Sequence, residues 1–148
     1  MTGYTTPPTT ISVGGRDYRI NTDFRVWLKF QADVENAKKE EIVDVVQRFL
    51  RSQNLPVCEE TFEKVLYFFT CGKSKEEQGG NGRQPKEKAV DFAKDEPLIF
   101  SAFLAQYGIN LRIAELHFWD FMAMFQGLSE DHLIVKIMGY RIADTSKM

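Results

Sequence analysis

Alternation of apolar and polar positions marks the first structured segment of the chain, residues 9–20. Ile11 and Tyr18 lie on either side of a Gly14-Gly15 pair, whose residues tolerate the positive φ of a two-residue turn. A hairpin closed by this turn places Ile11 opposite Tyr18 and leaves one face apolar. Because an isolated hairpin is marginal in water, we expect it to pack against the helices that follow.

Spacings of three and four residues between apolar positions dominate the rest of the chain and predict six helices. Capping residues, glycines and a proline define their expected ends. The predicted helices are one that Asn21 or Thr22 caps, one over about Lys38–Ser52, one over about Glu59–Cys71, one capped by Asp95 and ended by Gly108, one over about Arg112–Gln126, and one capped by Ser129. The expected fold class is mainly α, with about six helices and an N-terminal β-hairpin in one compact domain over residues 1–148.

Two apolar stripes follow the first predicted helix, which indicates that it is buried on more than one side. One stripe holds Phe24, Trp27, Leu28 and Gln31, and the other holds Val26, Phe30 and Val34. Over the whole chain, the large side chains expected in the core include Trp27, Phe49, Phe69, Phe103, Trp119 and Phe125.

Two segments have a composition that does not favour packed structure. Residues 73–88 contain no large apolar side chain, three glycines, a proline, five positive charges and three negative ones. Such a stretch cannot bury a core, so we expect a mobile surface loop there and a flexible start over residues 1–8. A phosphate-binding or nucleic-acid-binding patch in 73–88 is the alternative, which the absence of aromatic residues and the glutamates disfavour.

Overall composition excludes several classes of protein. The 148 residues are 43% hydrophobic and 27% charged, which is typical of a globular domain. Nineteen Lys and Arg against 21 Asp and Glu give a net charge of −2, so the basic excess of a nucleic-acid-binding protein is missing. No apolar run is longer than Val65 to Phe69, which is too short to cross a bilayer, and the polar start lacks the apolar region of a signal peptide. We therefore expect a soluble, intracellular protein that binds neither nucleic acid nor membrane.

Catalytic and metal-binding patterns are weak. His117 and Asp120 are three residues apart and can form a hydrogen-bonded pair, but a half-buried histidine satisfied by a partner explains His117 better than catalysis does. Asp91, Asp95 and Glu96 cluster as a metal site would, yet Asp95 is already explained as a helix cap and further ligands are missing. We expect no enzyme activity, no metal and no cofactor.

The remaining reactive side chains suggest no chemistry either. Cys58 and Cys71 are too few for a disulfide framework and lack zinc-ligand spacing, so reduced, buried thiols are expected. His132 falls in the first turn of a predicted helix and should be solvated. A phosphate-binding loop at the Gly14-Gly15 pair is disfavoured because its accompanying lysine and its glycine spacing are both absent.

The segment Leu116–Phe125, LHFWDFMAMF, is apolar around more than one helical face. A helix of this kind is either buried on all sides or meets a partner. Methionine and aromatic side chains suit an adaptable protein-binding surface as well as a core. We therefore keep both interpretations, and take Phe118, Met122 and Phe125 as candidate protein-interaction residues. Some of the three should remain accessible if the segment has more apolar surface than one core can cover.

Five blocks of this sequence, in this order and spacing, resemble the bacteriophage gene-product-fifteen family. They are GGRDYRINTDFRVWLKFQ at 14–31, YFFTCGK at 67–73, DFAKDEPLIFSAFLAQYGINL at 91–111, LHFWDFMAMFQGL at 116–128 and IMGYRIADTSKM at 137–148. The resemblance covers almost the whole chain except its start and residues 73–88. Two departures are Phe118-Trp119, where the family usually has a Trp-Trp pair, and Asn110, where it favours Asp. Both swaps leave the packing plausible.

The resemblance implies a small protein of siphophage or prophage tail modules, encoded between the major tail protein and the tape measure protein. That position usually belongs to a tail assembly chaperone, which coats the tape measure protein and recruits tail-tube subunits in the host cytoplasm. The implied partners are the tape measure protein and the major tail protein, with self-association also possible. A head–tail adaptor or another structural virion protein is the alternative.

Overall fold

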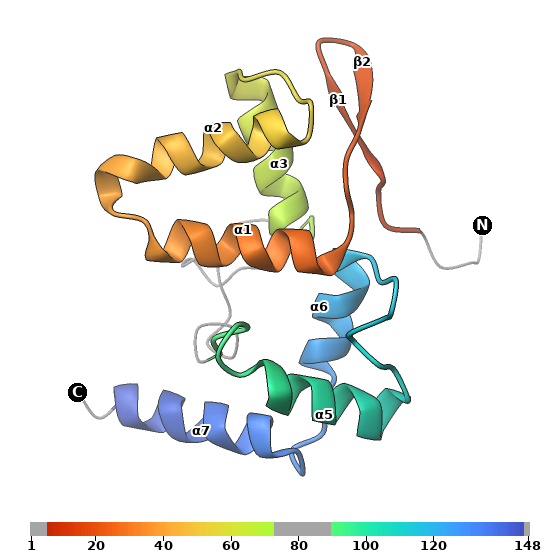
Figure 1. The fold of residues 1–148 in the computed structure, drawn as a ribbon, viewed down its shortest axis with the longest axis vertical. Coiled ribbons are helices and arrows are strands. Elements are labelled where there is room, and N and C mark those ends of the chain that lie inside the picture. The colour runs from red at the N-terminus through yellow and green to blue at the C-terminus, as the bar shows by residue number, and fades with distance from the viewer. Residues whose placement is uncertain (1–5, 73–89, 147–148) are drawn as a thin grey trace. The chain divides into compact units, whose positions relative to one another are not determined.

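The computed structural model describes residues 6–72 and 90–146 (Figure 1). Its elements are strands β1 (Thr10–Val13) and β2 (Arg16–Arg19), helices α1 (Phe24–Asn36), α2 (Ile42–Ser52), α3 (Glu59–Phe69), α5 (Glu96–Tyr107), α6 (Phe118–Gln126) and α7 (Leu133–Ser146), and a 3₁₀ turn at Lys39–Glu41. The mainly α fold, with six α-helices and an N-terminal hairpin over these residues, is confirmed. The loop expected at 73–88 and most of the flexible start lie outside the described residues.

The chain divides into two compact units. Unit 1 comprises Met1–Lys73 with His117–Trp119, and unit 2 comprises Ser74–Leu116 with Asp120–Met148. The division falls after the second residue of α6. A single cooperative domain over 1–148 therefore stays a prediction, which unfolding experiments can test.

The N-terminal hairpin of unit 1 has the predicted register. β1 and β2 pair in antiparallel fashion with Ile11 opposite Tyr18, and the turn glycines Gly14 and Gly15 have φ values of 60° and 77°. Ile11 is buried, and β1 packs against α3. The Gly14 N–H also donates to Glu60 Oε1 at 3.1 Å, so the hairpin tip is tied to the first turn of α3.

An aromatic core centred on Trp27 holds the helices of unit 1 together. Trp27 is only 1% exposed, and its ring lies 5.0 Å from Phe49, 4.5 Å from Phe68 and 5.9 Å from Phe118, centroid to centroid. Its Nε1–H donates to the Asn21 carbonyl at 2.7 Å, so the one polar atom of the side chain is satisfied.

Several helix ends in unit 1 differ from the prediction. Asp23, and not Asn21 or Thr22, caps α1, because its carboxylate accepts the Arg25 N–H at 2.8 Å. The predicted third helix ends at Phe69 instead of Cys71, since Cys71 adopts a left-handed φ of 58°.

Unit 2 is built around a second group of stacked rings. Phe103 and Phe121 stack with centroids 5.1 Å apart, and Phe125 lies 5.1 Å from Phe92 and 6.3 Å from Phe121. α5 and α7 lie side by side and run in opposite directions (Figure 1). Gly108 ends α5 in the left-handed region at φ 70°, as the sequence predicts.

The predicted fifth helix begins six residues too early. Residues 112–117 are not helical, and α6 starts at Phe118. The reason is tertiary: within unit 1, His117 forms an isolated β-bridge with Asp23, and the Phe118 N–H donates to the Thr22 carbonyl at 2.7 Å. If the helix began earlier, the Phe118 N–H would donate to the carbonyl four residues before it. Because this N–H is already bonded to Thr22, the helix cannot extend toward residue 112.

The last helix also begins later than expected. Ser129 does not cap α7, which starts at Leu133. Its hydroxyl oxygen accepts the Asp131 N–H at 3.3 Å and its backbone carbonyl accepts the His132 N–H at 3.2 Å, so the chain makes a turn before the helix.

Three of the six expected core side chains are buried. Trp27, Phe103 and Phe125 are at most 1% exposed, which confirms them as core residues. Phe49, Phe69 and Trp119 are half-buried instead. For Phe49 the cause is an opening in the surface between α1 and α2, which forms the candidate site described next.

Candidate functional site

The three predicted interaction residues on α6 lie inside the protein. The exposed fractions are 1% for Phe118, 8% for Met122 and 0% for Phe125, so the expectation of partial accessibility is wrong. Phe118 is covered within unit 1, where Phe68 and Phe69 stack on it at 6.1 and 6.2 Å. Burial of these side chains explains why α6 is apolar around several faces, and a direct partner contact through them stays a prediction.

His117 serves a structural purpose in unit 1. Its Nδ1 accepts the Trp119 N–H at 2.9 Å, and its Nε2 lies 2.8 Å from the Pro8 carbonyl. With Nδ1 as the acceptor, Nε2 must carry the proton and donate to Pro8. Both ring nitrogens are engaged, which leaves neither for the predicted pair with Asp120. The interpretation as a half-buried histidine satisfied by its partners is confirmed.

The acidic residues near the start of α5 are used within unit 2. Asp95 does not cap the helix with its side chain, which instead accepts two hydrogen bonds from Arg141 at 2.7 and 3.2 Å. These bonds lower the pKa of the Asp95 carboxyl and raise that of the Arg141 guanidinium. Glu96 pairs with Arg112 at 3.7 Å. Over residues 6–72 and 90–146, no three His, Cys, Asp or Glu side chains gather as metal ligands would.

The cysteines and His132 differ from their expected surroundings. Cys58 is exposed at the start of α3 and Cys71 is half-buried, so the prediction of buried thiols is wrong, although neither cysteine forms a disulfide. A hydrogen bond with the Thr61 hydroxyl, 3.3 Å away, lowers the pKa of the Cys58 thiol. His132 is half-buried, and its Nε2 lies 2.9 Å from Gln106 Oε1, so it is not merely solvated.

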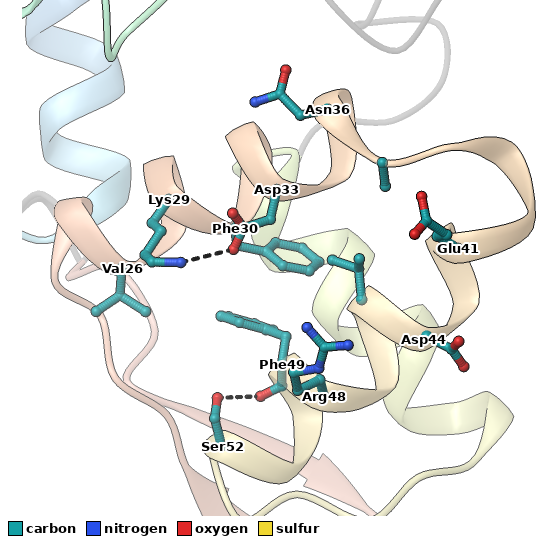
Figure 2. A pocket seen from close by; sticks show the side chains of 12 residues that line it. Val26, Lys29, Phe30, Asp33, Asn36, Glu41, Asp44, Arg48, Phe49 and Ser52 are labelled. Atoms are coloured by element: carbon teal, nitrogen blue, oxygen red, sulfur yellow. Dashed lines mark hydrogen bonds and ion pairs between the residues drawn. The ribbon is translucent and has the colours of Figure 1, made fainter.

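A groove of about 670 Å³ opens between α1 and α2 in unit 1 (Figure 2). The two helices lie side by side and run in opposite directions. The lining residues are Val26, Lys29, Phe30, Asp33, Asn36, Ala37, Glu41, Asp44, Val45, Arg48, Phe49 and Ser52. We call this feature the α1–α2 groove.

The floor of the α1–α2 groove is apolar. Phe30 and Phe49 stack with centroids 4.0 Å apart and an interplanar angle of 22°, and Figure 2 shows their rings facing each other between the helices. Val26 and Val45 each lie one helical turn before one of these rings and are half-buried. Four apolar side chains thus line a concave surface that the rest of unit 1 leaves open.

Charged side chains surround this floor. Lys29 pairs with Asp33 at 3.0 Å along α1, and Glu41 Oε1 accepts the Lys38 N–H at 3.0 Å. Asp44 and Arg48 on α2 have no hydrogen-bond or ion-pair partner within the described parts of the chain. An apolar floor with a charged rim is the usual composition of a protein-binding surface.

Sequence reasoning missed this groove, although its signal was present. The second stripe of the first predicted helix holds Val26 and Phe30, and the apolar positions of the next helix include Val45 and Phe49. We interpreted both as core. Phe30 is buried and packs on Phe69 of α3, whereas Val26, Val45 and Phe49 are half-buried, and only the tertiary structure shows which side of a helix pair is covered.

The described structure is a mainly α protein with a concave surface that has an apolar floor and a charged rim, which is typical of a binding module. Residues 6–148 match the family model described as "Bacteriophage Gp15 protein", and the chain belongs to this family. Membership implies a phage structural or assembly protein. Neither a curated protein nor a solved structure matches the chain. Among the residues described, no helix is both long and apolar enough to span a bilayer.

Proposed function

We propose that this protein is a non-enzymatic tail assembly chaperone that binds the tape measure protein, tail-tube subunits or both during tail morphogenesis. Family membership supports the phage assembly role, and the α1–α2 groove supports binding in place of catalysis. In this role the protein would act in the cytoplasm of the bacterial host.

The α1–α2 groove is the observation that carries the proposal. A helix that presents apolar side chains at positions i, i+3 or i+4, and i+7 is the natural occupant of a groove between two helices. Phe30 and Phe49 provide the apolar floor, and the rim carries both signs of charge. A long helical protein such as a tape measure protein offers many segments of this kind.

Co-expression with the neighbouring tape measure protein tests this proposal. We expect the wild-type pair to co-purify and the groove variant Val45→Glu to lose the partner, because a carboxylate would then stand on the apolar floor. Val43→Glu is the matched control, since Val43 lies on the same helix, is 59% exposed and does not line the groove. Circular dichroism verifies that each variant is folded.

Two outcomes would contradict the proposal. If the wild-type protein fails to co-purify with both the tape measure protein and the major tail protein, the chaperone function is wrong. If mass spectrometry finds the protein in stoichiometric amounts in finished virions, a permanent component such as a head–tail adaptor is the better explanation, because a chaperone leaves before assembly is complete.

A further inference from the structure

Helix α7 of unit 2 carries an exposed apolar stripe. Leu133 is 58% exposed and Tyr140 is 77% exposed, and the half-buried Ile137 lies between them. Their positions are i, i+4 and i+7, so the three side chains share one face of the helix. A different face of α7 already supplies core residues, since Ile134 and Met138 are at most 1% exposed. We call Leu133, Ile137 and Tyr140 the α7 stripe.

The α7 stripe and the α1–α2 groove are complementary in shape. The groove is concave with an apolar floor of stacked rings, whereas the stripe is convex and ends in two large exposed side chains. The spacing of the stripe is the one that a helix-in-groove contact uses. One chain therefore carries both halves of such a contact, one half in each unit.

The charged side chains beside the α7 stripe and on the rim of the α1–α2 groove are also complementary. Lys136 lies next to the α7 stripe, three residues after Leu133 and four before Tyr140, and Asp44 lies on the rim of the groove. Neither side chain has an ion-pair partner in the part of the chain that the structure describes. The other basic residue of α7 in that part, Arg141, is engaged by Asp95. Of the basic side chains of α7 in the described residues, Lys136 is thus the one available to pair with Asp44.

We propose that the α7 stripe of a second copy of this chain docks in the α1–α2 groove. Leu133 and Tyr140 of one copy lie against Phe30 and Phe49 of the other, and Lys136 pairs with Asp44. Because the contact joins two different surfaces, each copy keeps a free groove or a free stripe, and association continues into a chain or closes into a ring. This inference goes beyond the proposed function. It also means that a partner helix and a second copy compete for the same groove.

Sedimentation velocity on the full chain alone tests this contact over a range of concentrations. We expect wild-type protein to form dimers and larger species as its concentration rises. Val45→Glu blocks the groove and Tyr140→Glu blocks the stripe, so each variant alone should need at least tenfold more protein to associate. Val43→Glu and Ile142→Glu are the matched controls, since both introduce a carboxylate at an exposed position of the same helix outside the contact.

Mixing the two blocked variants distinguishes this contact from other modes of association. The Tyr140→Glu protein keeps its groove and the Val45→Glu protein keeps its stripe, so an equimolar mixture should form dimers and nothing larger. A mixture that stays monomeric would overturn the proposal, and so would a wild-type protein that stays monomeric up to about 1 mM. If the α7 stripe occupied the groove of its own chain, the wild-type protein would stay monomeric. A wild-type protein that stops at a dimer has formed the smallest closed ring, with two reciprocal contacts.

A charge exchange provides a second test that leaves the packing intact. Asp44→Lys and Lys136→Glu each place like charges opposite each other and should weaken association about two- to fivefold, the range of an exposed ion pair. The double variant restores the pair with its signs reversed and should associate as the wild type does. If the double variant is weaker than both single variants, Asp44 and Lys136 do not meet. None of these tests involves the tape measure protein, so their outcome is independent of the chaperone proposal.

Discussion

The two units of this protein both close around aromatic rings, but different polar interactions hold them. In unit 1 the polar atoms of the aromatic side chains bind backbone carbonyls: Trp27 Nε1 donates to Asn21, and Trp119 Nε1 donates to Phe68 at 2.7 Å. These bonds carry no net charge. In unit 2 a charged pair, Asp95 with Arg141, joins the N-terminus of α5 to α7. Asp95 is the buried charged side chain among the described residues, so this link in unit 2 depends on pH.

The two units also differ in the shape of the apolar surface that they expose. Unit 1 leaves a concave apolar opening between α1 and α2, whereas unit 2 leaves a convex apolar stripe on α7. α3 packs against one side of the α1–α2 pair and leaves the groove on another side, and α7 buries one face and leaves a second face exposed. Each unit can therefore bury the central rings of its core and still expose apolar side chains to a partner.

Truncating the central ring of either unit should have the largest effect. We expect Trp27→Ala in unit 1 and Phe103→Ala in unit 2 each to lower the free energy of unfolding by about 3–5 kcal/mol, the usual result of emptying a buried aromatic site. Urea unfolding followed by circular dichroism measures both. Val43→Ala, at an exposed site, should change stability by less than about 0.5 kcal/mol.

The same variants show whether the units unfold together. Both tryptophans of the chain, Trp27 and Trp119, lie in unit 1, so tryptophan fluorescence reports on that unit alone. In the Phe103→Ala variant, a single cooperative domain gives coincident fluorescence and circular dichroism midpoints. A fluorescence midpoint that stays at the wild-type value while the dichroism midpoint falls would show two separate domains.

Removing the charge of Asp95 should cause the next largest loss of stability, and the size of this loss should depend on pH. Arg141 lowers the pKa of this carboxyl, so the folded state binds the proton more weakly than the unfolded state does. The stabilisation is present above the unfolded pKa of about 3.9 and is lost as the pH falls through the lower folded value. Asp95→Asn should cost about 1–3 kcal/mol at pH 7 and much less at pH 2, measured by urea unfolding.

A matched control separates this pair, in which only Asp95 is buried, from a pair that is exposed on both sides. Glu96→Gln removes the pair with Arg112, whose side chains are 50% and 61% exposed, and should cost less than about 1 kcal/mol. If Asp95→Asn lowers the free energy of unfolding equally at pH 7 and at pH 2, Asp95 acts through packing and not through its charge.

Loss of the α1 cap should have a moderate effect on unit 1. Asp23→Ala removes the acceptor for the Arg25 N–H and should cost about 0.5–2 kcal/mol. The fluorescence midpoint in thermal unfolding measures it. Asp23→Asn keeps a capping oxygen and should retain most of the stability, whereas a variant at the originally predicted cap, Thr22→Ala, should change it little.

The smallest expected effect is a gain in unit 2. Gly139 lies inside α7, and a Cβ added there meets no atom within 4 Å, so Gly139→Ala should stabilise the protein by about 0.4–1 kcal/mol. Gly108→Ala is the contrasting change, because Gly108 has a φ of +70° and an alanine there is strained. Thermal unfolding that moves the two midpoints in the same direction would contradict this account.

Local chemistry in the sequence determined much of this protein. The Gly14-Gly15 turn sets the hairpin register because a two-residue loop leaves one pairing, and Gly108 ends α5 because its backbone adopts the left-handed region without strain. Helical spacing determined the existence of all six helices in the described residues, and the blocks along the chain determined its family. Each of these features depends on residues that are neighbours in sequence.

Contacts between distant residues decided the rest. The start of α6 depends on a bond from Phe118 to Thr22, almost a hundred positions earlier, and the pairing of Asp95 depends on Arg141. Apolar periodicity does not reveal whether a second helix covers a stripe, so it left Phe118 open between core and surface and assigned Phe49 to the core. The fold buries Phe118 and leaves Phe49 half-buried. The α1–α2 groove exists because, among the described residues, α3 packs against only one side of the α1–α2 pair, and only the arrangement of whole elements in space decides that.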